Sequence, residues 1–161
     1  MKSKQFQPSH RYAQKLRLII MIIALLLLFG SVLLGWLISL DDDISSEGAR
    51  TVVVICTAVN LIWFIPALLM TGPYYRSLNY EIQDDEVIVR AGIITKSVKH
   101  VPYRTVTNLV VKRGPFDRWI FDLGTLCIET AGISGTTGAE EVLAGLPNVD
   151  EVYDLVVDEL R

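Results

Sequence analysis

Two long runs without charge constrain this chain more than any other feature of its sequence. Residues 18–40 and 51–71 contain no Asp, Glu, Lys or Arg, although charged residues make up 20% of the chain. As helices the runs would be about 34 and 31 Å long, which is enough to cross a hydrocarbon core of about 30 Å. Only residues 41–50 separate them, so the two helices are expected to be antiparallel neighbours. Residues 18–71 are therefore predicted to form a transmembrane hairpin.

Basic residues are distributed unevenly around the hairpin. Residues 1–17 carry five Lys or Arg and no acid, whereas the loop between the runs carries four acids and only Arg50. Because basic flanks stay in the cytoplasm, the N-terminal segment and everything after residue 71 are expected there. A cleaved signal peptide is disfavoured, since the first run is too long and no cleavage site of small residues follows it. The prediction is a two-pass protein of the cell membrane.

Small and polar residues within the runs are candidate helix–helix contacts. Gly30 and Ser31 precede Gly35 in the first run, and the spacing of Ser31 and Gly35 lets helices approach closely. Thr57 and Asn60 share a face of the second helix. An amide in hydrocarbon requires a partner, so Asn60 is expected to point at the first helix or at another subunit. A transport path is disfavoured, because neither run carries an ionisable acid or base.

The pattern after residue 71 changes to short alternating segments. Six strands are predicted, over residues 78–83, 86–90, 93–101, 105–113, 123–130 and 140–146. Residues 115–122 are expected to form a short helix or turn, and residues 131–137 a flexible loop. Asn148 or Asp150 is expected to cap a terminal amphipathic helix. Residues 72–161 are thus predicted to be a domain with a mainly antiparallel sheet and a C-terminal helix.

Several short motifs in residues 80–130 resemble a known family. They are Val87–Ile94, Val101-Pro102-Tyr103-Arg104, Thr107-Asn108, Arg113-Gly114-Pro115 and Leu123-Gly124-Thr125. Together with the preceding hairpin they resemble the bacterial pleckstrin-homology-like membrane proteins, long classed as a domain of unknown function and including the short YdbS-like proteins. The resemblance implies a partly open barrel of six or seven strands with a C-terminal helix, so one strand is still to be placed. It implies no catalytic residues.

The sequence contains none of the common catalytic or cofactor motifs. It has no HExxH, CxxC or GxSxG pattern, and the glycine-rich residues 132–138 lack the Gly-Lys-Ser/Thr of a phosphate loop. His10 and His100 are the only histidines, and Cys56 and Cys127 are expected in different phases, which disfavours a disulfide. We predict no metal and no cofactor, and an enzymatic role is disfavoured.

A basic stretch between residues 90 and 118 is the strongest sign of an interaction site. Its candidate lipid- or partner-binding residues are Arg90, Lys96, Lys99, Arg104, Lys112, Arg113 and Arg118. Adjacent strands could gather Lys96, Lys99, Lys112 and Arg113 into one patch. Alternatively, these are solvated charges that blunt sheet edges. Nucleic-acid binding is disfavoured, because residues 72–161 hold fourteen acids against nine basic residues.

Two functions follow from these features. The first is a scaffold or assembly subunit, in which hairpin and domain pair with a second copy or with a larger membrane protein that has similar domains. The second is binding of anionic lipid headgroups, which attract a nearby basic side chain by about 1 kcal/mol each. Assembly is favoured, because the hairpin already anchors the chain. Residues 1–17 are expected to be a basic cytoplasmic arm that is disordered or lies on the membrane.

Overall fold

The computed structural model describes residues 4–40, 46–130 and 141–160 of the 161-residue chain. The chain divides into two compact units, one of residues 16–72 and the other of residues 1–15 with 73–161. The acidic part of the predicted turn, residues 41–43, and the predicted loop over residues 131–137 lie outside the described residues.

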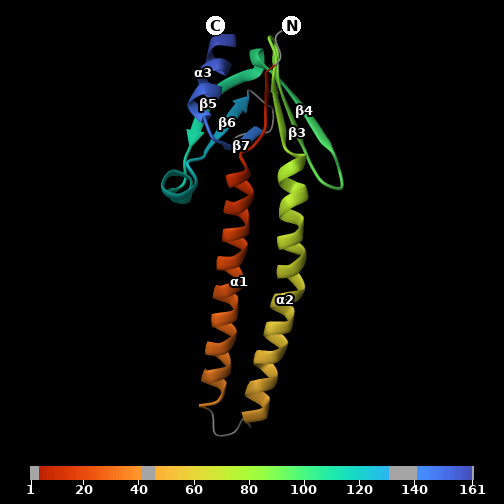
Figure 1. The fold of residues 1–161 in the computed structure, drawn as a ribbon, viewed down its shortest axis with the longest axis vertical. Helices are drawn as coiled ribbons and strands as arrows, with labels where there is room; N and C mark the ends of the chain where they lie inside the picture. Colours follow the sequence, from red (N-terminus) through yellow and green to blue (C-terminus); the bar gives the residue numbers. More distant parts are fainter. Residues whose placement is uncertain (1–3, 41–45, 131–140, 161) are drawn as a thin grey trace. The chain divides into compact units, whose positions relative to one another are not determined.

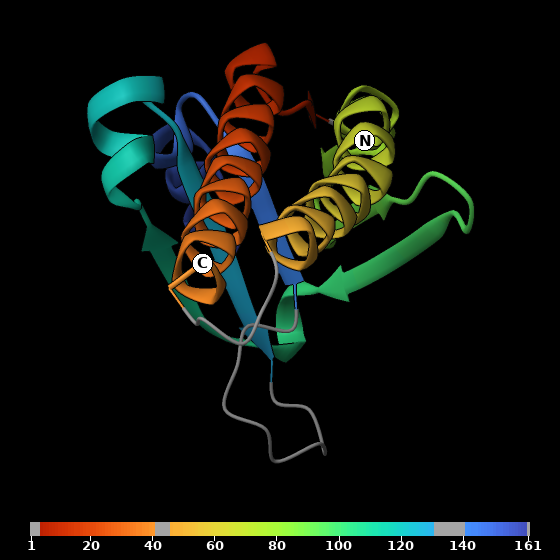
Figure 2. The same ribbon diagram turned by 90° about the horizontal axis from the view of Figure 1, so that it is seen from below.

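The unit of residues 16–72 is a pair of helices. Helix α1 (His10–Ile38) and helix α2 (Ser46–Ser77) lie side by side in both views (Figures 1 and 2). Leu25, Phe29 and Ile62 on their outer surfaces are 69, 66 and 72% exposed. Lipid would cover such side chains, which a soluble protein would bury. Both helices are long and apolar enough to cross a membrane, and they extend beyond the predicted starts at residues 18 and 51.

The other unit contains two antiparallel sheets. The first has the strand order β1 (Lys4–Phe6), β2 (Asn79–Ile82), β3 (Glu86–Ala91) and β4 (Ser97–Pro102). The second has the order β5 (Val106–Lys112), β6 (Gly124–Thr130) and β7 (Glu141–Leu146). The short helix η1 (Tyr103–Thr105) joins the sheets, η2 (Asp117–Phe121) joins β5 to β6, and α3 (Val149–Glu159) follows β7. The predicted partly open antiparallel fold with a C-terminal helix is confirmed.

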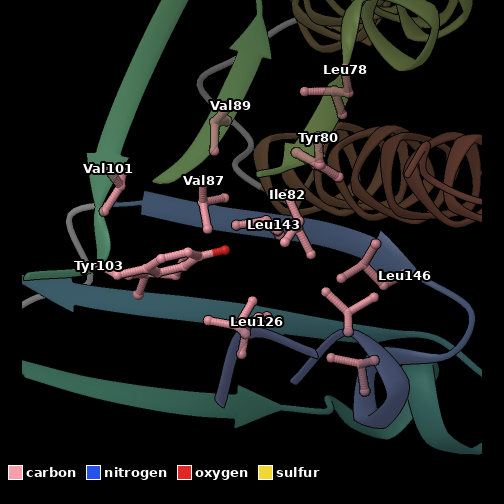
Figure 3. Packing of buried hydrophobic residues seen from close by; sticks show 14 residues of the cluster. Leu78, Tyr80, Ile82, Val87, Val89, Val101, Tyr103, Leu126, Leu143 and Leu146 are labelled. Carbon is pink, nitrogen blue, oxygen red and sulfur yellow. The ribbon is translucent and has the colours of Figure 1, made fainter. Parts of the chain in front are cut away.

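The core lies between the two sheets and α3 (Figure 3). Alternate residues of the strands point inward, as the period of two requires. The fully buried large side chains are Tyr80, Val87, Leu126, Ile128, Leu143, Leu146, Val149, Val152 and Val156. Burial of one such aliphatic side chain stabilises a fold by about 1.5–3 kcal/mol, so this cluster explains why residues 73–161 and the N-terminal segment form one compact unit.

The N-terminal segment differs most from its prediction. Residues 1–17 are predicted to be disordered or to lie on the membrane, but Lys4–Phe6 pairs with β2, with Phe6 opposite Tyr80. Residues 10–15, the first turns of α1, belong to the same unit, and Tyr12 packs against its core. β1 is thus the seventh strand that the predicted barrel lacked. Three residues are too few to show an alternating pattern.

The remaining differences from the predicted elements are small. The third predicted strand begins at Ser97 rather than at residue 93, because Gly92 has a φ of 120° and a turn follows it. Residues 117–121 form a single π-helical turn where a short helix or turn is predicted. Asn148 precedes α3 as its N-cap residue, although its side chain accepts no capping hydrogen bond.

Candidate interaction site

Three of the seven basic candidates form ion pairs within their own unit. The pairs are Arg90–Glu81, Lys99–Glu141 and Arg113–Asp150, with nitrogen–oxygen distances of 2.8, 2.5 and 2.5 Å. The acidic partners come from β2, β7 and α3, which lie outside the basic stretch in the sequence. The positive charge of these three residues is therefore largely compensated before any partner binds.

The other four candidates make no ion pair among the described residues. Lys96 lies in the β3–β4 turn, Arg104 in η1, Lys112 on β5 and Arg118 in η2. The patch expected from adjacent strands is not formed by strand pairing, because β4 and β5 belong to different sheets. The predicted strands are also interrupted after residue 101, but the sequence does not show that the strands on either side of η1 belong to different sheets. The structure therefore distributes the basic stretch over several elements.

The Glu81 carboxylate on β2 links this strand to β3 in the first sheet. It is 8% exposed, and it accepts hydrogen bonds from Gln83 Nε2 at 2.9 Å and from Arg90 Nη1 at 2.8 Å. The bond from Gln83, and then the bond and charge of Arg90, hold the pKa of Glu81 below its usual range. Arg90 and Glu81 are thus a structural pair between β2 and β3.

The outer edge of β7 is closed by hydrogen bonds. The Tyr80 hydroxyl donates to the Ala144 carbonyl at 3.1 Å and accepts from the Ala144 N–H at 3.0 Å. The Ser9 N–H donates to the Gly145 carbonyl at 2.9 Å. Burial raises the pKa of Tyr80, so its hydroxyl keeps the proton that it donates. Residues from the first sheet and from the N-terminal segment therefore satisfy the backbone of this edge.

A cavity of about 390 Å³ remains beside this closed edge, where the two sheets separate. Tyr12, Tyr80, Lys99, Glu141 and Ala144 are among its lining residues. Lys99 and Glu141 also line a second hollow of about 330 Å³. The ion pair between them thus bridges the opening of the barrel, which main-chain bonds leave unclosed among the described residues.

β4 forms the edge of the first sheet, and its backbone pattern shows which groups point outward. The Tyr103 N–H donates to the Asp85 carbonyl at 3.1 Å, just beyond the β3–β4 ladder. Hydrogen-bonded pairs alternate along an antiparallel ladder, so the pairs in register with this one, such as Val89 with Lys99, are the hydrogen-bonded pairs. Residues on β4 between them direct N–H and C=O away from β3.

Val98 and His100 are the residues with outward-pointing main-chain groups. They lie opposite Arg90 and Ile88 in the register, and all side chains from Ser97 to His100 are exposed. Among the described residues, the N–H groups of Val98 and His100 find no main-chain acceptor on another segment. β4 therefore presents two donors and two acceptors along an accessible edge.

The charged side chains of β4 that could protect this edge are bound to acidic side chains of other strands. Lysines along an edge strand discourage pairing with another chain. Here the Lys99 ammonium is bound to Glu141, and His100 Nδ1 lies 2.9 Å from Glu86 Oε1. Side chains of the same domain therefore hold these groups, which leaves the β4 backbone accessible.

The candidate contact residues of the hairpin lie in different environments. Ser31 and Asn60 are each 7% exposed, and Asn60 Nδ2 donates to the Ala24 carbonyl at 2.9 Å. Asn60 Oδ1 has no hydrogen-bond partner among the described residues. Thr57 is half-buried and lines a hollow of about 330 Å³ together with Asn60.

The two candidate glycines of the hairpin also lie in different environments. A Cβ at Gly35 would lie 2.2 Å from Val53 Cγ2, so the helices meet closely at this point. A Cβ at Gly30 would have nothing within 4 Å. Gly35 is used within the hairpin, whereas Gly30 faces open space.

The described residues contain no group of three or more His, Cys, Asp or Glu placed to hold a metal ion. Cys56 and Cys127 are free thiols.

Comparison with known proteins gives one match. A family model described as a bacterial PH domain matches residues 14–160. No curated protein and no solved structure matches the chain. The matched range includes most of α1 and all of α2, the strands β2 to β7 and α3, whereas β1 precedes it.

Proposed function

The chain belongs to the bacterial PH domain family, and we propose that it is a membrane-anchored scaffold or assembly subunit. Its PH-like domain pairs with a second PH-like domain, from another copy of this chain or from a larger membrane protein. The observation that supports this proposal is the β4 edge, where Val98 and His100 direct main-chain groups outward.

Strand addition to a sheet edge is a common way for domains to bind each other. Val98 and His100 are two residues apart, so their outward groups repeat at about 6.8 Å, the spacing at which an antiparallel strand places its own donors and acceptors. An added strand would gain up to four main-chain hydrogen bonds. Main-chain pairing is open to any extended segment, and the exposed side chains of β4 would select the partner.

The hairpin is the tether in this proposal. Helices over residues of about 18–40 and 51–71 span the cell membrane, and the basic flank keeps the domain of residues 72–161 in the cytoplasm. Confinement to one leaflet raises the effective concentration of two anchored domains, so a short edge is enough for stable pairing. Assembly in this proposal involves no enzymatic step.

Co-purification of two differently tagged full-length copies tests the proposal, together with recovery of larger PH-domain membrane proteins from native membranes in mild detergent. Val98→Pro removes one outward N–H from β4 and leaves the ladder with β3 intact, because that N–H makes no bond to β3. We expect a loss of recovery of about tenfold or more, since removal of one of four edge bonds also disturbs its neighbours.

Val98→Thr is the matched control, because it keeps the backbone and the β-branched shape. It should recover as much partner as the wild type. Equal recovery with Val98→Pro and Val98→Thr would contradict pairing along β4. A wild-type protein that remains a monomer without a PH-domain partner would contradict assembly altogether.

Binding of anionic lipid headgroups is a second candidate function. The observation in its favour is that Lys96, Arg104, Lys112 and Arg118 make no ion pair among the described residues. We expect the full-length protein to retain more anionic than neutral lipid from mixed nanodiscs, and the excess to fall as salt rises. Gln at all four positions should abolish the excess, whereas Arg113→Gln, at an ion-paired position, should change it little. An unchanged lipid ratio in the fourfold variant would contradict this function.

A further inference from the structure

Two turns of the PH-like domain expose large apolar side chains. In and beside η2, Phe116, Trp119 and Ile120 are 40, 82 and 59% exposed. In the β3–β4 turn, Ile93 and Ile94 are 37 and 92% exposed. Neither group belongs to the β4 edge or to the basic candidates, so both turns require a separate explanation.

The η2 turn is firmly folded, so the exposure of its side chains is a property of the fold. Asp117 is 6% exposed, and its carboxylate accepts from the Gly114 N–H at 3.2 Å. The Leu123 N–H donates to the Asp117 carbonyl at 3.0 Å, and the Arg118 N–H donates to the Gly114 carbonyl at 2.9 Å. These bonds close the turn on both sides and hold Trp119 outward.

The η2 turn is also bound to the first residues of α1. Lys15 Nζ lies 2.6 Å from Asp117 Oδ1, and Arg11 Nη1 donates to the Phe121 carbonyl at 3.4 Å. α1 is a continuous helix from His10, so the apolar run that begins at Leu18 lies only about 4.5 Å further along its axis than Lys15. The turn is therefore bound to the residues of α1 that directly precede the apolar run.

The β3–β4 turn is bound to the end of α2. The Gly92 N–H donates to Ser77 Oγ at 3.2 Å, and Ser77 is the last residue of that helix. The apolar run ends at Thr71, about 9 Å before Ser77 along the helix. Each exposed turn is thus attached to one of the two points where the chain passes between domain and apolar helix.

We propose that both turns insert their apolar side chains into the headgroup region of the leaflet from which α1 and α2 enter the membrane. Trp is enriched at this depth, because its ring is apolar and its N–H is polar. Arg118 and Lys96, which lie beside the apolar residues in sequence, are placed to meet lipid phosphates. The partner is the bilayer surface, since both turns are bonded to residues just outside the apolar runs. This inference stands independently of pairing along β4.

Depth-dependent fluorescence quenching of the full-length protein in vesicles tests the proposal. The chain has three tryptophans, so Trp36→Phe with Trp63→Phe leaves Trp119 as the only emitter. Phosphatidylcholine brominated near the headgroup should quench Trp119 at least twice as strongly as lipid brominated near the chain end. Ile94→Trp combined with removal of all three native tryptophans should show the same pattern.

Asp158→Trp in a background without the other tryptophans is the matched control, because this residue is exposed on α3. It should show no quenching by either lipid. Equal quenching at Trp119 and at the control position would overturn the proposal. Protection of Trp119 from iodide without quenching by brominated lipid would overturn it as well, because a protein would then cover the turn. Quenching at Trp119 without quenching at position 94 would overturn the arrangement of two inserted turns.

Discussion

The outer edges of the two sheets in the PH-like domain are treated in opposite ways. At β7, the Tyr80 hydroxyl satisfies both main-chain groups of Ala144, and Ser9 reaches the Gly145 carbonyl. At β4, Val98 and His100 direct the same kinds of group outward, with no such bond among the described residues.

The two edges therefore differ in how far the domain itself satisfies their main-chain groups. The chain uses its N-terminal segment and a buried tyrosine to cover β7, although β4 is just as exposed to unwanted pairing. The domain thus satisfies main-chain groups of Ala144 and Gly145 on one edge, and it leaves those of Val98 and His100 on the other edge accessible.

Gly145→Ala should have the largest effect, because it opens the closed edge. Gly145 has a φ of 75°, and a Cβ there would lie 2.5 Å from Tyr12 Cγ. Backbone strain and the clash together should lower the free energy of unfolding by about 2–4 kcal/mol. Thermal unfolding in detergent measures this. Gly30→Ala, where a Cβ meets nothing within 4 Å, should leave the midpoint unchanged or slightly raised. Similar midpoints for both variants would contradict close packing of Tyr12 on β7.

Tyr80→Phe should have the next largest effect. It removes the hydroxyl and leaves the partly buried Ala144 N–H and carbonyl without their partner, which costs up to about 1–3 kcal/mol. Chemical denaturation monitored by circular dichroism gives the difference. Tyr153→Phe is the control, since Tyr153 packs against the same core and its hydroxyl makes no hydrogen bond among the described residues. A smaller loss at Tyr80 than at Tyr153 would show that the hydroxyl does not close the edge.

The bridge between Lys99 and Glu141 should contribute less. The Lys99 side chain is 56% exposed, and exposed ion pairs contribute about 0.2–1 kcal/mol. A double-mutant cycle with Lys99→Met and Glu141→Gln measures the coupling. A coupling well above this range would mean that the pair locks β4 to β7, and the opening between the sheets would then be a closed seam.

Glu81 in the interior of the first sheet provides a pH test. Its pKa is lower in the folded protein than in the unfolded chain, so its contribution to stability is complete above the ordinary glutamate pKa of about 4.3. The contribution is lost as the pH falls through the lower folded-state pKa. Unfolding midpoints measured from about pH 6 down to about pH 3 should decline less for Glu81→Gln than for the wild type. Parallel profiles would show that Glu81 is not stabilised by Gln83 and Arg90.

Local patterns in the sequence were sufficient to predict most elements of the fold. The absence of charge over residues 18–40 and 51–71 defined two apolar helices, and alternation with turn residues located the strands β2 to β7. Each of these signals lies within one segment. Each arises because apolar side chains avoid water, either along a whole helix or on one face of a strand.

Contacts between distant segments were not predictable in this way. β1 has three residues, and its role depends on β2, more than seventy positions away in the chain. The partners of Arg90, Lys99 and Arg113 were missed because an ion pair across a fold leaves no periodic trace in the sequence. The sequence likewise does not show that β4 and β5, on either side of η1, belong to different sheets. Without these contacts, four of the seven basic residues could be placed in one patch on adjacent strands.

Hydrogen exchange at single-residue resolution along β4 tests the central claim most directly. The amides of Val98 and His100 should exchange slowly in native membranes and rapidly in nanodiscs that hold one copy of the protein. The Lys99 and Val101 amides, which face β3, should be protected in both and serve as the internal control. Rapid exchange of Val98 and His100 in both preparations, with Lys99 and Val101 protected, would contradict assembly through the β4 edge.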